Sequence, residues 1–520
     1  MDLLIINAKR MWSQDRSSLG YGAITIATYL HSKGHKVFLV DDNSQYKNYS
    51  FEDYCRFIED KHPKMVGFSV TALNAAKSYD LARSLKNRYP NLFLIAGGFH
   101  SCDAGDEIVE QDFDIVFRGE AEISCNKFLN IAKEHITKFN IPVKNKGDLI
   151  GKMSQIPGLL FNQDGGIVNT GNPTVLENLD EIPFINFDIF NLNDFVKKKS
   201  DHHNVTNVVI SQRGCPFRCN FCKSEILPDI VRGASAKHVF EELKYRYEKF
   251  GIDLFRIEDA NFTIMRKKMH DFCELMISSG MSKKISLWIQ SGVTIRLSST
   301  ELNLMRKANI VVFGIGVERF DNECRKKMRK AGSGEVALEF VRKVYESGIK
   351  TNLSILLNTP FESNETLERE SILMSNALPF VSFFHIAFIM PFPGTEYYKK
   401  ESRHYKWYLN KSMMDYKISY YENAYVITTP ALHYNPFEHS SEIMTKILAF
   451  NEKFHKEGGL RFSSSLVYKV CFRADLFLAK GSFYLNKISV KLERTIFAPI
   501  LTLKIYGYKL FYNRFVMKHD

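Results

Sequence analysis

Cysteine is sparse in this chain, and long apolar stretches are absent. Nine cysteines are spread over 520 residues, and only three of them lie close together. Secreted proteins stapled by disulfides carry cysteine densely, so this usage predicts a reducing compartment and a cytoplasmic protein. The chain starts with an apolar run, Leu3–Asn7, without the basic and apolar segments of a signal peptide. No apolar run has the length that crossing a bilayer requires, so a membrane-spanning protein is not expected.

Acidic residues are fewer than basic ones, and much of the excess is local. The formal net charge is +12, and residues 440–520 hold 14 Lys and Arg against 6 Asp and Glu. Hydrophobic residues make up 45% and charged residues 25% of the chain, which is typical of globular domains. The length allows two to four domains, and we find no internal repeat or low-complexity segment.

Three cysteines stand on one short loop near the middle of the sequence. Cys215, Cys219 and Cys222 have the spacing C-x3-C-x2-C and follow an apolar, β-branched run at 207–210. That run predicts a buried strand, and the carboxyl ends of strands carry the chemistry of α/β folds. Three thiolates on one loop can hold three irons of a [4Fe–4S] cube and leave the fourth iron open.

The cysteine loop is also rich in positive charge, and two other interpretations of its cysteines are open. Arg213, Arg218 and Lys223 would favour the thiolate form of the cysteines. A structural zinc site would require a fourth ligand, and His202 and His203 do not have a matching spacing. Unrelated buried cysteines are the third interpretation, although such residues seldom share one loop with Gly, Pro and Arg.

This three-cysteine loop, with the aromatic Phe221 directly before the last cysteine, resembles the signature of the radical S-adenosylmethionine (radical SAM) superfamily. The resemblance implies a [4Fe–4S] cluster on Cys215, Cys219 and Cys222. It further implies that S-adenosylmethionine (SAM) binds the open iron and that Phe221 lies near its adenine. Packing in the core is the alternative role for Phe221.

Residues 1–140 alternate between two periodicities. Strands are predicted at Leu3–Asn7, Lys36–Val40, Met65–Val70, Leu92–Ala96 and Asp114–Phe117, and helices at Tyr21–Ser32, Phe51–Asp60, Ala75–Arg88, Asp106–Gln111 and Glu122–His135. Such alternation predicts a Rossmann-like, flavodoxin-like domain with a parallel sheet and a ligand at the strands' carboxyl ends. No G-x-G-x-x-G follows the first strand, which argues against a nicotinamide dinucleotide.

Gly-Phe-Ser after the third strand, Gly-Gly-x-His after the fourth and Arg-Gly-Glu-x-Glu after the fifth resemble the cobalamin-binding domain of class B radical SAM enzymes. The resemblance implies cobalamin contacts from Ser69, Thr71, Gly97, Gly98, Gly119 and Glu120. The loop at 8–13 has no histidine, so the lower face of the corrin is expected to lack a protein imidazole. A domain that binds nothing is the alternative, and His100 alone is more typical of a packed loop residue.

Residues 141–204 form a predicted linker with a hairpin around 163–165, and residues 205–395 a predicted open (β/α)6 partial barrel. The barrel strands are expected at Val208–Ser211, Asp253–Ile257, Ile285–Gln290, Val311–Val317, Thr351–Leu357 and Phe383–Ile389. The helices between them are expected at Ala236–Phe250, Arg266–Ser279, Thr300–Lys307, Gly334–Ser347 and Glu365–Asn376.

Polar residues end successive strands of the predicted barrel. By resemblance, Glu258 binds the amino group of SAM, because a carboxylate suits an ammonium. Gln290 and Ser291 end the next strand, with Arg296 nearby, in the region where relatives bind the methionine carboxylate. Glu318 ends the fourth strand in a Gly-x-Gly-x-Glu segment that resembles the ribose site.

Two segments depart from the family pattern. Arg319 stands where relatives often have Ser, and Asn358–Glu362 replaces Gly-x-Pro-Gly-Glu without its glycines. Pro391–Thr395 closes the core as in many class B proteins. For each strand-end carboxylate, the alternative is a solvated side chain or one paired with lysine.

Residues 396–520 are expected to form a mostly helical region, rich in basic and aromatic residues. Apolar residues recur at helical spacing opposite a basic face: Leu485, Ile488, Leu492, Ile496, Leu503 and Leu510 against Lys487, Lys491, Arg494 and Lys509. Pro499 would kink such a helix. We expect this stripe to cap the barrel. Peripheral contact with an anionic membrane is the alternative, and nucleic acid is not expected.

Together these features predict a radical SAM enzyme with a [4Fe–4S] cluster and cobalamin. The expected reaction is methylation of an unactivated carbon of a small-molecule or lipid-like substrate, with a flavodoxin- or ferredoxin-type electron donor. Radical ring closure or rearrangement with the same cofactors is the first alternative. A non-catalytic iron–sulfur or cobalamin sensor is the second, and it would not need the ordered polar residues at the strand ends.

Overall fold

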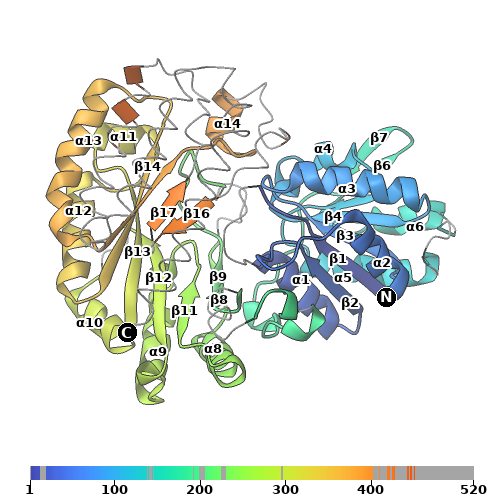
Figure 1. Cartoon of the computed structure of the whole chain (residues 1–520), viewed down its shortest axis with the longest axis horizontal. Helices are drawn as coiled ribbons and strands as arrows, with labels where there is room; N and C mark the ends of the chain where they lie inside the picture. The colour runs from blue at the N-terminus through green and yellow to red at the C-terminus, as the bar shows by residue number, and fades with distance from the viewer. Residues whose placement is uncertain are drawn as a thin grey trace. The chain divides into compact units, whose positions relative to one another are not determined.

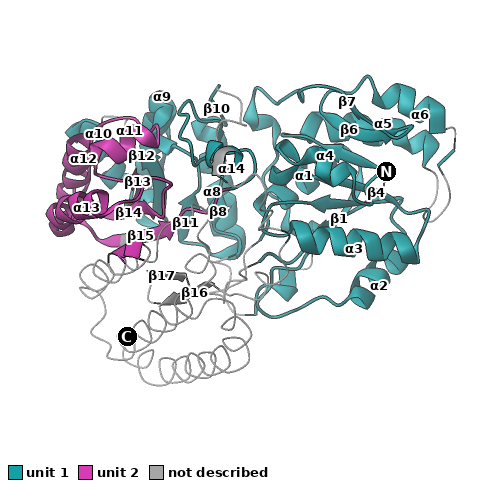
Figure 2. Cartoon of the chain, turned by 90° about the horizontal axis from the view of Figure 1, so that it is seen from above, with its two compact units in different colours: residues 1–291, 297–312, 392–415 teal, residues 292–296, 313–391, 416–520 magenta. Residues whose placement is uncertain are grey.

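The computed structural model describes residues 2–401 except 12–18, 137–138, 140–142, 145, 191, 198–204, 224–229 and 294–296. Beyond 401 it describes 409, 418–421, 424–427, 442–443, 446–447 and 450. Arg296, His202, His203, Pro499 and the stripe from Leu485 to Leu510 therefore lie outside the described residues. Two compact units divide the chain: residues 1–291, 297–312 and 392–415 form unit 1, and residues 292–296, 313–391 and 416–520 form unit 2 (Figure 2).

Unit 1 begins with a seven-stranded sheet in the order β2-β1-β3-β4-β5-β6-β7 (Figure 1). Its strands are β1 (Asp2–Asn7), β2 (Lys36–Asp41), β3 (Met65–Ser69), β4 (Phe93–Gly97), β5 (Ile115–Phe117), β6 (Leu159–Gln163) and β7 (Gly166–Asn169). The pairings among β1 to β5 are parallel, which confirms the predicted fold. The parallel strands are buried along most of their length, because helices cover both faces.

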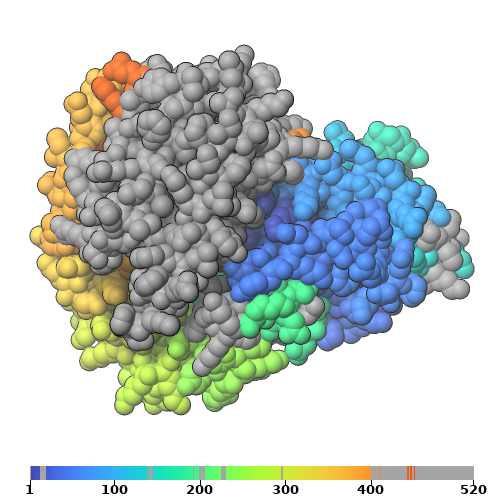
Figure 3. All heavy atoms as spheres, viewed as in Figure 1, coloured from blue at the N-terminus to red at the C-terminus, as the bar shows by residue number. Residues whose placement is uncertain are grey.

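Helices pack on both sides of this sheet. They are α1 (Tyr21–Ser32), α2 (Phe51–Lys61), α3 (Ala75–Arg88), α4 (Gly105–Val109), α5 (Glu122–His135) and α6 (Lys146–Met153). α1 and α5 lie on one face and α2 and α3 on the other (Figure 2). Ser50 and Asp53 form a capping box at the start of α2. Each side chain accepts a hydrogen bond from the backbone N–H of the other residue, and these N–H groups have no partner within the helix. Figure 3 shows one face of the molecule with all heavy atoms, on which the residues of this first domain appear in blue.

The hairpin of the predicted linker belongs to the first sheet. β6 pairs antiparallel with β5 through Phe117 and Leu159, and β7 pairs antiparallel with β6. Leu159, Leu160 and Phe161 are buried, whereas β7 is largely exposed. Burial of these apolar side chains explains why the segment joins the sheet, so the ordered first domain extends beyond the part that the alternating pattern reveals.

A second sheet has the order β15-β14-β13-β12-β11-β8. Its strands are β8 (Val208–Val209), β11 (Leu254–Ile257), β12 (Ser286–Gly292), β13 (Ile310–Glu318), β14 (Lys350–Leu357) and β15 (Phe383–Phe388). Sequential order with parallel pairing, as between β8 and β11, confirms the six-strand open barrel. The helices are α8 (Ala236–Phe250), α9 (Arg266–Ser278), α10 (Ser299–Lys307), α11 (Asn322–Lys327), α12 (Gly334–Glu346), α13 (Asn364–Ala377) and α14 (Glu396–Glu401).

Several short elements were not predicted. β9 (Gln212–Arg213) and β10 (Arg232–Gly233) pair antiparallel around the cysteine loop, and β16 (Ile418–Tyr421) pairs with β17 (Ala424–Ile427). Short 3-10 turns cover Phe99–Cys102, Leu179–Glu181, Phe187–Ile189, Leu192–Asp194, Phe262–Ile264, Met281–Lys283 and Leu378–Phe380. Among the described residues, no helix combines the length and apolarity that a membrane span requires.

Candidate functional site

The three cysteines lie on the loop between β9 and β10. Gly214 begins this loop with φ +92°, a conformation that a side chain disfavours. Cys219 is buried, and Cys215 and Cys222 are half-buried. The amide of Cys222 donates to the carbonyl of Cys219 at 3.0 Å, which forms a tight turn. The loop thus presents three thiols from one continuous segment.

The donor set of this loop suits an iron–sulfur cube. Thiolates are the protein ligands of [4Fe–4S] clusters, and this loop supplies three of them. Each thiolate of a cube binds a different iron, so the sulfurs need not converge on one point. Among the residues that the structure describes, no three His, Cys, Asp or Glu side chains gather as ligands of a single ion would.

Two of the cations that flank the cysteines have carboxylate partners. Arg213 donates to Glu120 at 2.8 Å and to Glu122 at 2.7 Å. Lys223 lies 2.9 Å from Asp103 and donates to the carbonyl of Phe99 at 2.9 Å. Arg213 and Lys223 therefore form ion pairs with carboxylates of the first domain. If their role were only to stabilise the thiolates, such pairs would not be expected.

Glu120 forms ion pairs with two arginines, Arg213 and Arg232. Arg232 of β10 forms a bidentate pair with Glu120, with Nη1 at 3.1 Å from Oε2. Burial raises the pKa of Glu120, but Arg232 and Arg213 outweigh that effect and hold the pKa below its usual range. Glu120, predicted to bind cobalamin, is thus ionised and paired with two arginines of the barrel segment.

Behind the cysteine loop lies a buried carboxylate, Asp259. It accepts from the amides of Ser211 and Gln212 at 2.6 and 2.9 Å, and from the Ser211 hydroxyl at 2.5 Å. Lys268 donates to the Ser211 carbonyl and hydroxyl at 2.6 and 2.7 Å. Burial raises the pKa of Asp259 and lowers the pKa of Lys268 to about 8. Asp259 therefore fixes the segment that enters the cysteine loop, whereas its neighbour Glu258 faces elsewhere.

The structure brings Glu258 and Gln290 together at the ends of β11 and β12. Gln290 Nε2 donates to Glu258 at 2.8 Å, and Arg256 pairs with Glu258 at 2.5 Å while it lies over the ring of Trp288. The Glu258 carboxylate is partly exposed beside the Arg256 guanidinium. This geometry places a carboxylate at the strand ends, where an ammonium group can bind.

Ser291 is buried and held by two neighbours that the sequence pattern did not single out. Its hydroxyl contacts the Asn261 side chain and lies 2.6 Å from the Thr263 hydroxyl. Ser291 is therefore part of a hydrogen-bonded group at the end of β12. Arg296, predicted beside it, lies outside the described residues. Phe221 is half-buried within the cysteine loop.

The predicted cobalamin residues lie on loops after β3, β4 and β5. The side chain of Asn74 accepts from the Thr71 amide at 2.7 Å and donates to the Ser69 carbonyl at 2.9 Å, which fixes the first loop. Gly98 has φ +108°, and a β-carbon there would meet the Val70 carbonyl oxygen at 2.6 Å. Gly97 ends β4, and Gly119 also has positive φ, at +61°. These loops therefore approach one another at the sheet's carboxyl edge.

His100 lies at the same carboxyl edge of the sheet, where its side chain is packed in the interior and not exposed to solvent. It is fully buried, and its Nε2 atom is 3.5 Å from Glu107. Its backbone amide donates to the carbonyl of Val70. These contacts agree with the packed-histidine interpretation that the sequence favoured.

In unit 2, Glu318 ends β13 in a strained backbone conformation. Its φ is +66°, which is unusual for a residue with a side chain. Lys330 Nζ lies 3.5 Å from its carboxylate, and a β-carbon at Gly316 would meet that carboxylate at 2.9 Å. Non-glycine residues in this conformation are frequent at functional sites, which motivates the ribose-binding hypothesis.

The next residue explains both departures from the family pattern. Arg319 pairs with Glu362, and both side chains are fully buried. Glu362 also accepts from the amide and hydroxyl of Thr359 at 3.1 Å. Burial lowers the pKa of Arg319, but Glu362 and Glu370 outweigh that effect and raise it. The two unusual segments, after β13 and after β14, are therefore held together by one buried ion pair.

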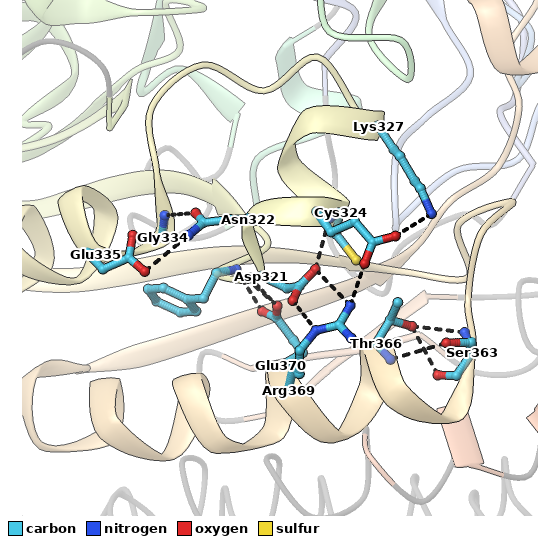
Figure 4. Close-up of polar contacts among 12 residues, drawn as sticks. Asp321, Asn322, Cys324, Lys327, Gly334, Glu335, Ser363, Thr366, Arg369 and Glu370 are labelled. Carbon is cyan, nitrogen blue, oxygen red and sulfur yellow. Dashed lines mark hydrogen bonds and ion pairs between the residues drawn. The ribbon is translucent and has the colours of Figure 1, made fainter.

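Next to Arg319 in the chain, a polar network joins the start of α11 to α13 (Figure 4). Glu370 accepts from the amides of Phe320 and Asp321 at 2.8–3.0 Å, and burial raises its pKa. Asp321 caps α11 through the amide of Cys324 at 2.9 Å and accepts from Arg369 at 2.6 Å. The segment that follows Glu318 is therefore fixed by Glu370 and Arg369 of α13 and by the cap that begins α11.

Asn358 directly follows β14 with φ +61°, at the first position of the segment that resembles Gly-x-Pro-Gly-Glu. Its side chain is fully buried, and neither polar atom has a hydrogen-bond partner among the residues that the structure describes. Asparagine tolerates the left-handed region better than most residues, which explains how the chain dispenses with glycine there.

We expect Asn358→Gly to keep the stability of the native protein and Asn358→Ala to be less stable than Asn358→Gly by about 1–2 kcal/mol. The reason is that alanine carries a β-carbon into a left-handed backbone. Urea unfolding of the variants measures the difference. An alanine variant as stable as the glycine variant would contradict the backbone explanation.

Two regions of this chain match models of known protein families. A family model described as the radical SAM superfamily matches residues 209–370, and one described as a B12 binding domain matches residues 20–129. The chain belongs to the cobalamin-dependent radical SAM family. Its cofactors are a [4Fe–4S] cluster, S-adenosylmethionine and cobalamin, as predicted.

Relatives of this radical SAM protein carry out more than one reaction. The hopanoid C-3 methylase of Methylococcus capsulatus is 25% identical over 395 residues, which cover 74% of this chain and 68% of the methylase. The anaerobic magnesium-protoporphyrin IX monomethyl ester cyclase of Cereibacter sphaeroides is 26% identical over 284 residues, or 54% of this chain and 44% of the cyclase. Among solved structures, the cobalamin-dependent S-adenosylmethionine radical enzyme OxsB matches with a TM-score of 0.64 and 14% identity over 92% of this chain and 72% of OxsB, which shows a shared fold.

Some residues that organise this radical SAM site escaped the sequence patterns. They are Asp103, Arg232, Asn261, Thr263 and Lys268, each of which contacts a predicted site residue or the segment around the cysteines. Asp103 and Arg232 each lie close in sequence to a predicted motif, but their partners lie in other parts of the chain. No spacing rule could pair them.

Proposed function

We propose that this protein is a cobalamin-dependent radical SAM methyltransferase that methylates an unactivated carbon of a small-molecule or lipid-like substrate. The observation that carries the proposal is the three-cysteine loop, which ion pairs join to the loops after β4 and β5 of the cobalamin-type domain. The similarity to a hopanoid methylase supports methyl transfer and a lipid-like substrate. A flavodoxin- or ferredoxin-type protein is the proposed electron donor.

In this proposal, Cys215, Cys219 and Cys222 hold the cluster. Glu258 binds the ammonium group of SAM, and Gln290 orients that carboxylate through the 2.8 Å hydrogen bond. Ser291, Arg296, Glu318 and Phe221 complete the proposed SAM site. When bound, the cluster would supply an electron and cobalamin would carry a methyl group, whereas SAM itself would be the source of the radical and of that methyl group.

The first domain binds cobalamin in the same proposal. The loops that carry Ser69, Thr71, Gly97, Gly98, Gly119 and Glu120 would hold the corrin. The backbone at Gly98 lies close to the Val70 carbonyl, and this is possible because glycine has no side chain that would collide with it. The described part of the loop after β1 has no histidine, so a protein imidazole from that loop is not proposed for the lower face.

The test is a single-turnover assay with anaerobically reconstituted enzyme. Candidate substrates, including polycyclic lipids, are incubated with SAM that carries a deuterated methyl group, and the products are analysed by mass spectrometry. We expect a product with the label on carbon, together with 5′-deoxyadenosine. Protein with alanine at all three cysteines of the loop is the matched control and should give neither compound.

Ring closure is the second candidate, because a cyclase is also among the relatives. It predicts a product that has lost hydrogen and gained no deuterated methyl group. That outcome would overturn the methyltransferase proposal and leave the cofactor assignment intact.

A further inference from the structure

Basic residues on both sides of the cysteine loop contact two loops of the first domain. Before the cysteines, Arg213 binds Glu120 and Glu122 at 2.7–2.8 Å. After them, Lys223 lies 2.9 Å from Asp103, donates to the Phe99 carbonyl and stands 5.1 Å from the Phe99 ring centroid. The first group lies on the β5–α5 connection, and the second follows β4. These are two of the loops assigned to cobalamin.

The contacts are balanced in charge and largely shielded from water. Arg213, Lys223 and Arg232 face Glu120, Glu122 and Asp103, and no side chain of the six is more than 20% exposed. Ion pairs at the surface contribute little to structure, whereas shielded and hydrogen-bonded ones lose much when one partner is removed. Arg232 also donates to the Leu176 carbonyl, which fixes it from a third direction.

The geometry of each acidic group ties it to a cobalamin-type loop. Glu120 directly follows Gly119, whose φ of +61° turns the chain. Asp103 closes the 3-10 turn that begins after Gly98, and its amide donates to the His100 carbonyl. A shift of either carboxylate therefore moves the backbone next to the glycines.

We propose that Arg213, Lys223 and Arg232 are positioning residues, which order the loops after β4 and β5 against the cysteine loop and so couple cobalamin binding to that loop. The inference rests on the proposed function, because it takes those two loops as cobalamin contacts. The cysteine loop then does more than hold iron: its flanking cations preorganise the second cofactor site and set the separation between the cluster and cobalt.

Charge exchange at Lys223 and Asp103 tests the proposal, because neither side chain is a proposed ligand of the cluster or a proposed contact of cobalamin; Lys223 follows Cys222 and was expected to favour its thiolate, so iron content is measured in every variant. Lys223→Glu and Asp103→Lys each place like charges together, and the double variant restores an attractive pair. We expect each single variant to weaken cobalamin binding by about 5- to 150-fold, the usual range for coupled sites. The double variant is expected to recover most of the affinity. Titration of the reconstituted full-length protein with hydroxocobalamin measures the dissociation constant.

A second measurement separates positioning from loss of structure. Reduced cluster and Co(II) cobalamin are both paramagnetic, and their dipolar coupling in electron paramagnetic resonance falls steeply with separation. We expect the coupling to weaken in both single variants and to return in the double variant, with iron content unchanged. The matched control exchanges charge in the exposed pair Lys267–Asp271 on α9, 2.7 Å apart, and should leave affinity and coupling unchanged.

The outcomes distinguish this inference from the proposed function. If the native protein binds no cobalamin, the proposed function fails. If it binds cobalamin and the single variants bind equally well, or the double variant stays as weak as the singles, the coupling through these ion pairs is wrong.

Discussion

Replacement of Cys215, Cys219 and Cys222 by alanine is expected to remove the iron–sulfur cluster from the protein. Anaerobically purified native protein should carry about four irons per chain, because three thiolates of one loop hold a cube. Each single alanine variant should lose most of this iron and all formation of 5′-deoxyadenosine, since a cube left with two thiolates is unstable. Iron and sulfide analysis, with the visible absorbance of the cluster, measures the loss.

Cysteines outside the loop provide the control for this prediction. Cys55 lies buried in α2 and Cys125 in α5, and replacement of either by alanine should leave the iron content unchanged. Full iron content in the triple alanine variant would overturn the assignment of the loop. Loss of iron in Cys55→Ala to the same extent as in Cys219→Ala would indicate unfolding rather than loss of a ligand.

Removal of one partner from the buried pair Arg319–Glu362 is expected to destabilise the protein strongly. Arg319→Met leaves the buried Glu362 carboxyl without its partner, and Glu362→Gln leaves Arg319 without that partner. Each change should lower the free energy of unfolding by about 3–5 kcal/mol. The same pair holds the segment after Glu318, so SAM affinity should also fall in both variants. Chemical denaturation and SAM titration measure the two effects.

The double variant Arg319→Met/Glu362→Met separates the ion pair from general packing. With both charges of the pair removed, neither partner is left without its counter-ion, and Glu370 keeps its hydrogen bonds from the amides of Phe320 and Asp321, so the double variant should be more stable than either single variant. Arg342→Met on α12 removes an exposed pair with Glu339 and should change the free energy of unfolding far less than either buried substitution. A double variant less stable than both singles would contradict the electrostatic explanation.

The periodic elements of this fold could be predicted because local patterns specify them. The predicted helices at Tyr21–Ser32, Ala75–Arg88, Glu122–His135 and Ala236–Phe250 coincide with α1, α3, α5 and α8. In each, apolar residues recur at helical spacing and are buried in the structure. α11, a helix of one or two turns, was missed because so short a segment shows no period, and Asp321 begins it through a cap.

At the strand ends, the sequence pattern did not predict which residue has which role. Glu258 and Asp259 are adjacent and chemically alike, and the sequence offered no means of separating their roles. Both residues follow the last residue of β11, where the backbone is no longer regular, and their partners differ: Asp259 accepts from the Ser211 amide and Glu258 from Gln290. The assignments to SAM and cobalamin remain predictions for the experiments above.

The sequence by itself determined the cofactor class, because three cysteines at fixed spacing on one loop are a local feature. It also determined the two α/β sheets, since apolar periodicity is read within each element. Only the tertiary structure decided which charges meet. Arg213 with Glu120, Lys223 with Asp103, and Arg319 with Glu362 are pairs of residues far apart in the chain. An ion pair depends on distances of a few ångströms in space, and such distances are set by how the elements pack.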